Sequence, residues 1–452
     1  MRMNASVRRG SYTIAPRARA SSALVLTLAC SIAWSVALAP SLAPSLAAQD
    51  TTRVAADSLA ERLRRAEEAI ALLREQLAAQ AASSVQSASR VQVELYGRVM
   101  MNAFSNRGSV NNADVPLFAL PDTGSASGGA GATIRQTSLG LAVAVPRVLG
   151  GDFAGDLHLD FFGGQVASSG GRHRPLVRLR TAYGTVRWRH AELLFGQESP
   201  LVAGVSPASL AAFGYPDFTA AGNLWQWLPQ LRVTGEVGAA GGAVRIGLQG
   251  AVLAPASGDP LGPFDTDVDR AERSKRPFLQ ARLRAQWGTG EGAGTEPAGE
   301  IGIGVHRGSI RRDDGSRVAS EAVAADVRIA LGRMVELRGE AYVGRAVRGL
   351  GGGGIGQLLT TGGAAIRDRG GWAQLIVKPS SLLELGTGCG VLDPEDAGLP
   401  LGRRRNVSCE AHATARPGGP LIFGLAYRRQ ETTYASGKVS NDHLNLATGF
   451  EF

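Results

Sequence analysis

The sequence is poor in lysine, aromatic residues and cysteine. Of its 48 basic residues only Lys275, Lys378 and Lys438 are lysine, aromatic residues make up 6% of the chain, and there are 3 cysteines. Glycine, by contrast, occurs 60 times in 452 residues. This mixture argues against a helical protein, because glycine weakens helices, and it favours many short strands joined by turns.

Long apolar runs and catalytic motifs are also missing. No run of about eighteen apolar residues follows residue 50, which excludes a membrane helix there. The 6 histidines are scattered, none at metal spacing with another, and no Gly-x-Ser-x-Gly nucleophile motif occurs. An outer-membrane phospholipase would need a Ser/His/Asn set, and a TonB-dependent transporter would need a plug domain that residues 50–90 are too few to form. We therefore predict that the protein is not an enzyme and needs no cofactor or metal.

Residues 1–48 have the layout of a secretory signal peptide. An apolar run over residues 23–39 is followed by Ala47, Ala48 and Gln49, where cleavage is expected. The arginines that precede this run are Arg2, Arg8, Arg9, Arg17 and Arg19. Their removal leaves 43 basic and 39 acidic residues, a net charge of +4 instead of +9. The positive net charge is therefore mainly a feature of the targeting segment. Without it, the charge no longer supports a role in binding nucleic acid.

Residues 50–82 carry a helical pattern. Apolar residues recur at spacings of 4 and 3 from Leu59 to Leu77, and Arg62 and Glu67 fall where they would pair between parallel chains. About three heptads are marginal alone. Two interpretations remain: a short periplasmic coiled coil, which would make the protein an oligomer and which we favour, and a single amphipathic helix packed on its own protein. Residues 83–90, rich in serine and alanine, form a linker.

From residue 91 to residue 452 the apolar period is two. Sixteen segments show this alternation, from "VELYGRVM" to "LNLATGFEF", and mostly tight turns follow the even-numbered ones. Long loops follow the odd-numbered segments, for example residues 105–132, 198–228, 254–275 and 344–369. This alternation predicts an all-β transmembrane fold, a 16-stranded antiparallel up-and-down β-barrel with periplasmic turns and external loops. A β-sandwich or a β-solenoid would also have alternating strands, but neither predicts the loop pattern.

The predicted strands have one apolar face and one charged face. Side chains such as Leu139, Leu157 and Ile246 should face lipid. The opposite face cannot fill a dry core without a large desolvation cost, so it predicts a water-filled lumen. The candidate basic residues of the pore are Arg98, Arg178, Arg180, Arg232, Arg245, Arg282 and Arg284. The candidate acidic residues are Asp156, Asp160, Glu198, Asp217, Glu236, Glu336 and Glu340.

Residues 198–228 form a long loop with the apolar content to fold into the barrel and narrow the pore. Such a constriction loop would set its acids, Glu198 and Asp217, against the arginines and create a transverse field. The alternative is that the arginines only neutralise carboxylates of the lumen. Both interpretations are open at the level of the sequence.

Two pairs of residues on the lipid-facing phase are of interest. Cys389 and Cys409 lie on neighbouring predicted strands at equal distances from Leu399. Antiparallel pairing would place them opposite each other in an oxidising compartment, so a disulfide and a coincidence of two small residues are both possible. Phe450 and Phe452 fall where a periplasmic aromatic girdle is expected.

The order of these features resembles the DcaP-like porins. The matching stretches are "ELYGRVMMNAF", "IRQTSLGLAV", "GDLHLDFFGG", "VRLRTAYGTVRW", "ELLFGQESPL" and "LPQLRVT", together with the heptads and the final Phe452. The resemblance implies a homotrimeric channel in the outer-membrane lipid bilayer for passive uptake of small, mainly anionic solutes such as carboxylates. Arg178 and Arg180 match the family's charged strand.

Outer-membrane barrels of this kind typically end on an aromatic residue. By that resemblance, Phe450 and Phe452 form a signal that the barrel-assembly machinery reads. The nearly balanced lumen charge departs from the family and predicts only a weak anion preference. The competing interpretation is a barrel closed by its loops, which acts as an adhesin or envelope anchor without transport.

Overall fold

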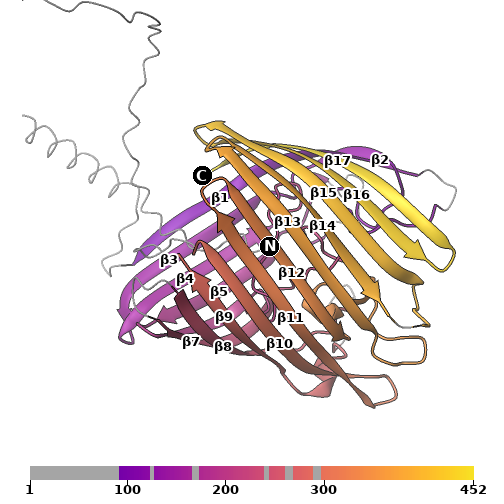
Figure 1. Ribbon diagram of the computed structural model, residues 1–452, viewed down its shortest axis with the longest axis horizontal. Coiled ribbons are helices and arrows are strands. Elements are labelled where there is room, and N and C mark those ends of the chain that lie inside the picture. Colours follow the sequence, from indigo (N-terminus) through magenta and orange to yellow (C-terminus); the bar gives the residue numbers. More distant parts are fainter. Residues whose placement is uncertain are drawn as a thin grey trace, which may run out of the picture. The chain divides into compact units, whose positions relative to one another are not determined.

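The computed structural model describes residues 91–122, 127–164, 173–238, 244–259, 268–288, 297–395 and 397–452. The predicted signal peptide, coiled-coil helix and linker lie outside these residues. The described residues form one sheet of antiparallel strands, and β1 pairs with β17 to close it (Figure 1). Each strand except the short β2, which pairs with β1, is hydrogen-bonded to a neighbour on both sides. Closure is the requirement for a sheet in a membrane.

The order of strands in the sheet follows the order in the chain. The strands are β1 (Gln92–Asn106), β2 (Gly129–Thr133), β3 (Ser138–Val148), β4 (Gly151–Asp160), β5 (Arg178–Arg187), β6 (Ala191–Glu198), β7 (Leu228–Val237), β8 (Val244–Leu253), β9 (Phe278–Trp287), β10 (Gly299–Arg311), β11 (Arg317–Leu331), β12 (Val335–Arg345), β13 (Arg367–Ser380), β14 (Leu383–Pro394), β15 (Arg403–Gly418), β16 (Leu421–Tyr434) and β17 (Gly437–Glu451). Three short 3-10 helices, η2 (Glu272–Ser274), η3 (Arg348–Leu350) and η4 (Gly353–Ile355), lie in the loops.

The predicted 16-stranded antiparallel barrel is confirmed, with one addition. Strands β2 and β3 pair with the two halves of β1 and together occupy a single position in the barrel. Between them Thr137 replaces the missing ladder contacts: its Oγ1 accepts a hydrogen bond from the backbone N–H of Met100 at 3.0 Å and donates one to the Met100 carbonyl at 3.3 Å. The ladder is thus broken without leaving these backbone groups unpaired.

The two halves of the barrel differ in strand length. Strands β3 to β9 contain 8 to 11 residues, whereas β10 to β17 contain 11 to 16. Residues 199–227 follow β6 at one end of the barrel, which we call the loop end. Two of the long loops expected at this end are replaced by extended strands. Residues 312–316 and 435–436 are short connections, because β10, β11, β16 and β17 extend as hairpins. The predicted alternation of long and short connections fails at these two places.

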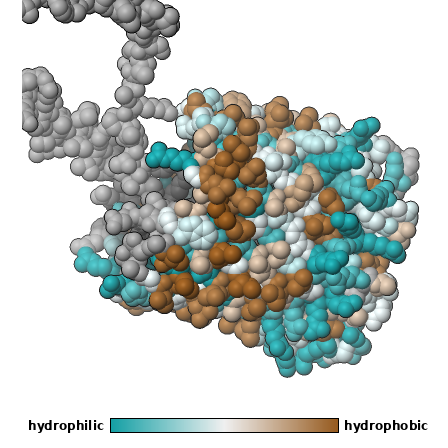
Figure 2. Space-filling model, viewed as in Figure 1, coloured by the Kyte–Doolittle hydropathy of each residue, from teal (hydrophilic) through white to brown (hydrophobic). Residues whose placement is uncertain are grey.

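The outer face is apolar and the inner face is polar. Leu139, Leu157 and Ile246 point outward and are 37%, 40% and 51% exposed, in agreement with the alternation of the sequence. Figure 2 shows apolar residues over the middle of the strands and hydrophilic residues toward the loop end of β10 to β16. Within the described residues no helix is long and apolar enough to cross a membrane.

The hydrophobic core sits inside the barrel. Leu201, Val202 and Leu224 of the loop between β6 and β7 pack with wall residues such as Phe278 and Ile310, all of them at most 2% exposed. This packing differs from the expected water-filled lumen. The sequence-based expectation treated the inner charges as solvated, whereas the inward loop covers many of them.

Candidate functional site: the inner face and the inward loop

Residues 199–227, here called the inward loop, are held inside the barrel by their backbone. Several of their N–H groups donate hydrogen bonds to side chains that point inward from β9, β11, β12 and β13. The donor and acceptor residues are Leu201 and Gln280 (2.6 Å), Gly204 and Asp326 (3.0 Å), Ala208 and Gln374 (2.9 Å), and Leu224 and Glu340 (3.1 Å). Side chains of the wall therefore satisfy backbone groups that the loop could not pair within itself.

Inward glycines make room for this loop. A Cβ added to Gly304 of β10 would lie 2.2 Å from the carbonyl oxygen of Val202. Gly222 of the inward loop has a φ of +101°, and a Cβ there would lie 2.2 Å from the backbone nitrogen of Gly371. The alternating glycines of "IGIGV" thus leave room for two different groups, because Gly304 faces the inward loop and Gly302 faces the Arg282 side chain. Glycines at alternate positions of a strand were the sequence signal for this close approach.

The break between β2 and β3 also supplies a hydrogen-bonding partner for the inward loop. Gln136 lies in this break and is fully buried. Its amide donates a hydrogen bond to the Ala211 carbonyl at 2.9 Å and accepts one from the Gly214 N–H at 2.8 Å. Gln136 therefore joins this part of the wall to the inward loop through two hydrogen bonds.

Arginines of the wall stack on aromatic residues of the inward loop. The guanidinium carbon of Arg180 lies 4.1 Å from the ring centre of Phe213 and 4.8 Å from that of Trp227. Arg178 lies 5.2 Å from the ring centres of Tyr215 and Trp227. Such contacts are favourable by about 0.5–2 kcal/mol each, more when they are desolvated. These contacts hold the inward loop against β5.

Most of the candidate arginines form ion pairs with carboxylates of the wall. The pairs are Arg98 with Glu451 (3.2 Å), Arg178 and Arg180 with Asp160 (2.6 and 3.7 Å), Arg245 and Arg284 with Glu236, and Arg282 with Asp326 (2.5 Å) and Glu300 (2.7 Å). Arg232 instead donates to the Ser199 carbonyl at 2.7 Å. The alternative interpretation, in which the arginines neutralise lumen carboxylates, fits this geometry.

The two acids expected to oppose these arginines, Glu198 and Asp217, do not do so. Asp217 forms an ion pair with Arg428 of β16, outside the set of candidate arginines. Glu198, at the end of β6, accepts a hydrogen bond from the Ser199 N–H at 2.6 Å. The transverse arrangement was wrong because the loop carries Asp217 across the lumen to the β15 and β16 wall, where Asn406 also holds the Ala220 carbonyl at 2.8 Å.

The other candidate acids have partners on the wall. Asp156 accepts a hydrogen bond from the Tyr96 hydroxyl at 2.5 Å, and Glu336 pairs with Arg338. Glu340 accepts from the Trp372 ring N–H at 3.1 Å. Each carboxylate is therefore part of a local network on the inner face.

Burial divides the inner charges into two groups. Arg180 and Arg282 are 1% exposed, and Asp160 is fully buried. The side chains of Arg245 and Glu236, close to the turn end of the barrel, remain 37% and 28% exposed. A buried ion must be paired because desolvation costs several kcal/mol, whereas the exposed pair is screened by water. Only the second group is well placed to meet a solute.

External loops fold over the inward loop. The backbone N–H groups of Trp225 and Gln226 both donate to the Leu350 carbonyl at 3.0 Å. Arg348, in η3, forms an ion pair with Asp259 at 2.6 Å, and burial lowers its pKa. The loops that precede β9 and β13 thus pack together above the lumen.

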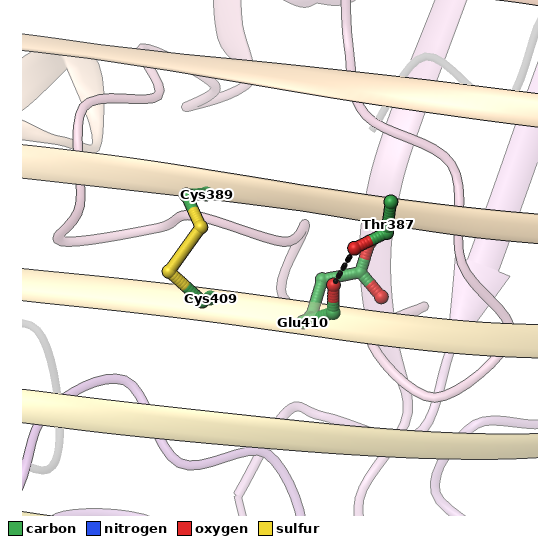
Figure 3. The surroundings of a disulfide bond; sticks show 4 residues. All are labelled: Thr387, Cys389, Cys409 and Glu410. Carbon is green, nitrogen blue, oxygen red and sulfur yellow. Dashed lines mark hydrogen bonds between the residues drawn. A yellow bond between two sulfur atoms is a disulfide. The ribbon is translucent and has the colours of Figure 1, made fainter.

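Cys389 and Cys409 are joined by a disulfide on the outer face. They are directly opposite in the β14 and β15 register, with a Cα–Cα distance of 4.0 Å (Figure 3). Beside them the Thr387 hydroxyl donates to the Glu410 carbonyl at 3.0 Å. Among the described residues, no group of three or more His, Cys, Asp or Glu side chains is arranged to hold a metal.

The C-terminal residues complete the closure of the sheet. The N–H of Phe452 donates to the Gly97 carbonyl at 3.1 Å, and the N–H of Gly97 donates to the Phe452 carbonyl at 3.0 Å. The rings of Phe450 and Phe452 are exposed on the outer face, with centroids 6.1 Å apart. They lie at the turn end, where the aromatic girdle was predicted.

Solved structures share this architecture. The outer membrane channel DcaP of Acinetobacter baumannii matches with a TM-score of 0.60 and 16% identity, over 82% of this chain and 99% of that one. The chain has the fold of the DcaP channel. The anion-selective porin from Comamonas acidovorans has a TM-score of 0.49 at 10% identity, covering 80% of this chain and 100% of that one. No family model and no curated protein matches the sequence.

Proposed function

We propose that the chain is an outer-membrane porin through which small hydrophilic solutes diffuse passively, with a weak preference for anions such as small carboxylates. The observation that carries the proposal is a closed 16-stranded barrel with an apolar outer face and a charged inner face crossed by an inward loop. A wall of this kind is stable in lipid and presents polar groups only to its interior. The fold shared with DcaP agrees with it.

The weak anion preference follows from the pairing of the inner charges. Arg245, the most exposed of the candidate arginines, is 3.9 Å from Glu236, and Glu236 also pairs with Arg284. Two arginines that share one carboxylate leave a local excess of positive charge, which attracts anions, but the opposite charge nearby reduces the field. Selectivity set by such a cluster is expected to be modest.

The closed barrel is a second candidate because the middle of the lumen is densely packed. The buried arginines Arg180 and Arg282 and the hydrophobic cluster around Leu201 and Phe278 occupy space that a wide pore would leave to water. If the inward loop seals the barrel, the protein would serve as a structural or adhesive component of the envelope.

Conductance across a planar bilayer separates the two functions. The full-length mature protein should give stepwise conductance, and the reversal potential in a salt gradient should show a modest anion preference. Swelling of proteoliposomes in sugars and small dicarboxylates checks permeation of neutral and charged solutes. Absence of both conductance and swelling from correctly folded barrels would favour the closed barrel.

The proposed trimer is supported by the short-stranded half of the barrel. At the loop end of β5, β7 and β8 the outward side chains Leu179, Leu231 and Val252 are 43%, 52% and 46% exposed and uncharged. Another copy of the chain would cover this sector, whose loop end lacks the charged side chains that the long-stranded half carries there. In this proposal the signal peptide exports the chain, the barrel-assembly machinery inserts it through the signal at Phe450 and Phe452, and the coiled coil joins the subunits in the periplasm.

A further inference from the structure

On the outer face of β10 to β12, apolar side chains give way to charged ones near the loop end. Val305, Val323 and Val343 point outward and are 48%, 46% and 58% exposed. Two residues further toward the loop end on β10, β11 and β12 lie Arg307, Glu321 and Arg345. The register pairs Val305 with Val323 and Val323 with Val343, so the boundary runs straight across the strands. Figure 2 shows hydrophilic residues on this side of the barrel toward the loop end.

A shallow groove of about 860 Å³ lies across this boundary. We call it the rim groove. Its floor includes Leu279, Val305, Val323 and Val343, and its edge carries Arg307, Arg345 and Arg367. The floor is therefore apolar, and the basic side chains stand on the side away from the middle of the barrel.

Positive charge exceeds negative charge around the rim groove. The exposed segment before β9 adds more basic side chains, and the register that pairs Arg307 with Leu279 places this segment beside the groove edge. The basic residues of the edge and of this segment are Arg273, Lys275, Arg276, Arg307, Arg345 and Arg367. The acidic ones are Glu272, Glu321, Glu395 and the buried Asp368. Glu321 pairs with Arg345 at 2.6 Å and with Arg307 at 3.9 Å, and Asp313 pairs with Arg273 at 3.7 Å, so much of this excess is already neutralised.

An apolar floor below a basic edge fits an amphiphile better than other occupants. Acyl chains would lie against the valines, and guanidinium groups bind phosphate through two parallel hydrogen bonds. A free phosphate would make no use of the floor. The uncharged sector of β5 to β8 offers a second copy of the chain a better surface, because no charged side chain has to be desolvated there.

We propose that the rim groove binds an anionic, phosphate-bearing lipid of the outer leaflet. The inference rests on the proposed outer-membrane location but not on transport, because a sealed barrel would carry the same groove. Lipid bound there would anchor the tall half of the barrel at the level of the headgroups, on the side away from the proposed contact between copies. Basic residues at headgroup level attract anionic lipid in this manner.

Native mass spectrometry of the full barrel tests the proposal. The mature protein is reconstituted in nanodiscs of equal parts phosphatidylglycerol and phosphatidylcholine, released, and examined for lipid that stays bound. The test variant combines Arg307→Gln, Arg345→Gln and Arg367→Gln. The control variant combines Arg147→Gln, Arg189→Gln and Arg333→Gln, which removes three exposed arginines from turns at the other end of the barrel.

The wild type and the control variant should retain phosphatidylglycerol in preference to phosphatidylcholine. In the test variant the amount of retained phosphatidylglycerol should fall at least threefold. A second variant, Val323→Asn, should weaken retention without changing charge.

Equal retention of phosphatidylglycerol by the test and control variants would overturn the proposal, as would equal retention of both lipids by the wild type. A loss of subunit association in the test variant would assign the groove to a second copy instead. Bilayer conductance of the same variants should match the wild type, so a failure of the lipid proposal is distinguishable from a failure of the porin proposal.

Discussion

At the scale of single residues, burial decides what an inner arginine can do. Arg282 is enclosed by Asp326, Glu300 and the inward loop, whereas Arg245 keeps more than a third of its side chain exposed. The same residue type on neighbouring strands therefore supports packing in one case and contacts solution in the other. Removing them should have different consequences.

Arg282→Ala should destabilise the barrel by about 3 kcal/mol, because it leaves buried carboxylates without a counter-charge. Thermal unfolding in detergent, followed by circular dichroism, measures the effect. Arg245→Ala is the matched control: its melting temperature should stay near the wild-type value, while its reversal potential should shift toward cations. An unchanged reversal potential in Arg245→Ala would remove this arginine from selectivity.

The disulfide between Cys389 and Cys409 predicts a simple thiol count. After cleavage of the predicted signal peptide, which would contain Cys30, the unfolded and unreduced protein should show no reactive thiol, and reduction should release two from the bonded pair. Alkylation followed by mass spectrometry gives the count. Two thiols without reduction would exclude the bond in the cell envelope.

At the scale of elements, the inward loop depends on the small residues of the wall. Gly304→Val would force the loop away from β10, because a Cβ there collides with the Val202 carbonyl. If the loop narrows the pore, the single-channel conductance should change by about twofold or more, in keeping with a constriction set by close packing. Gly250→Val on the outer face of β8, where no atom lies within 4 Å of the added Cβ, is the control and should conduct like the wild type.

The last strand supplies a second prediction at this scale. Deletion of Phe452 removes its two backbone hydrogen bonds to Gly97 and the outermost aromatic ring. The yield of folded barrel in the outer membrane should fall several-fold, while the amount of exported chain in the periplasm should not. Phe452→Tyr, which keeps the backbone and the ring, should assemble normally. Equal yields from the deletion and the wild type would leave Phe452 with a role in girdle packing alone.

At the scale of the whole molecule, the unequal strand lengths of the two halves bear on the proposed trimer. The short half presents uncharged residues such as Leu231, and the tall half carries charged residues at the loop end. Leu231→Gln should therefore lower the proportion of trimer, which native mass spectrometry or light scattering measures. Val391→Gln, outward on β14 in the tall half, should leave the trimer intact. A monomer in the wild type would contradict the proposed assembly.

The sequence by itself determined the sixteen strand positions of the barrel and the inner and outer faces of these strands, but not the short strand β2. The apolar period of two is a local property of each strand. In a closed sheet all residues of one alternating set face lipid and those of the other set face the interior, so the pattern of "VRIGLQGAV" predicts that Val244 and Ile246 point outward. It also placed Cys389 opposite Cys409, since the two lie at equal distances from Leu399 and the strands pair in antiparallel register.

The tertiary structure alone decided the partners of the inner charges and the path of the inward loop. Whether Asp217 meets Arg282 or Arg428 depends on strands far apart in the chain and on the course of a loop without regular periodicity. The burial of Arg180 and Arg282 likewise depends on that loop, because an empty barrel would have left both in water. The alternation of residues within a strand carries no information about contacts across the lumen. For this physical reason the faces of the strands follow from the sequence, whereas the partners of the inner charges follow only from the tertiary structure.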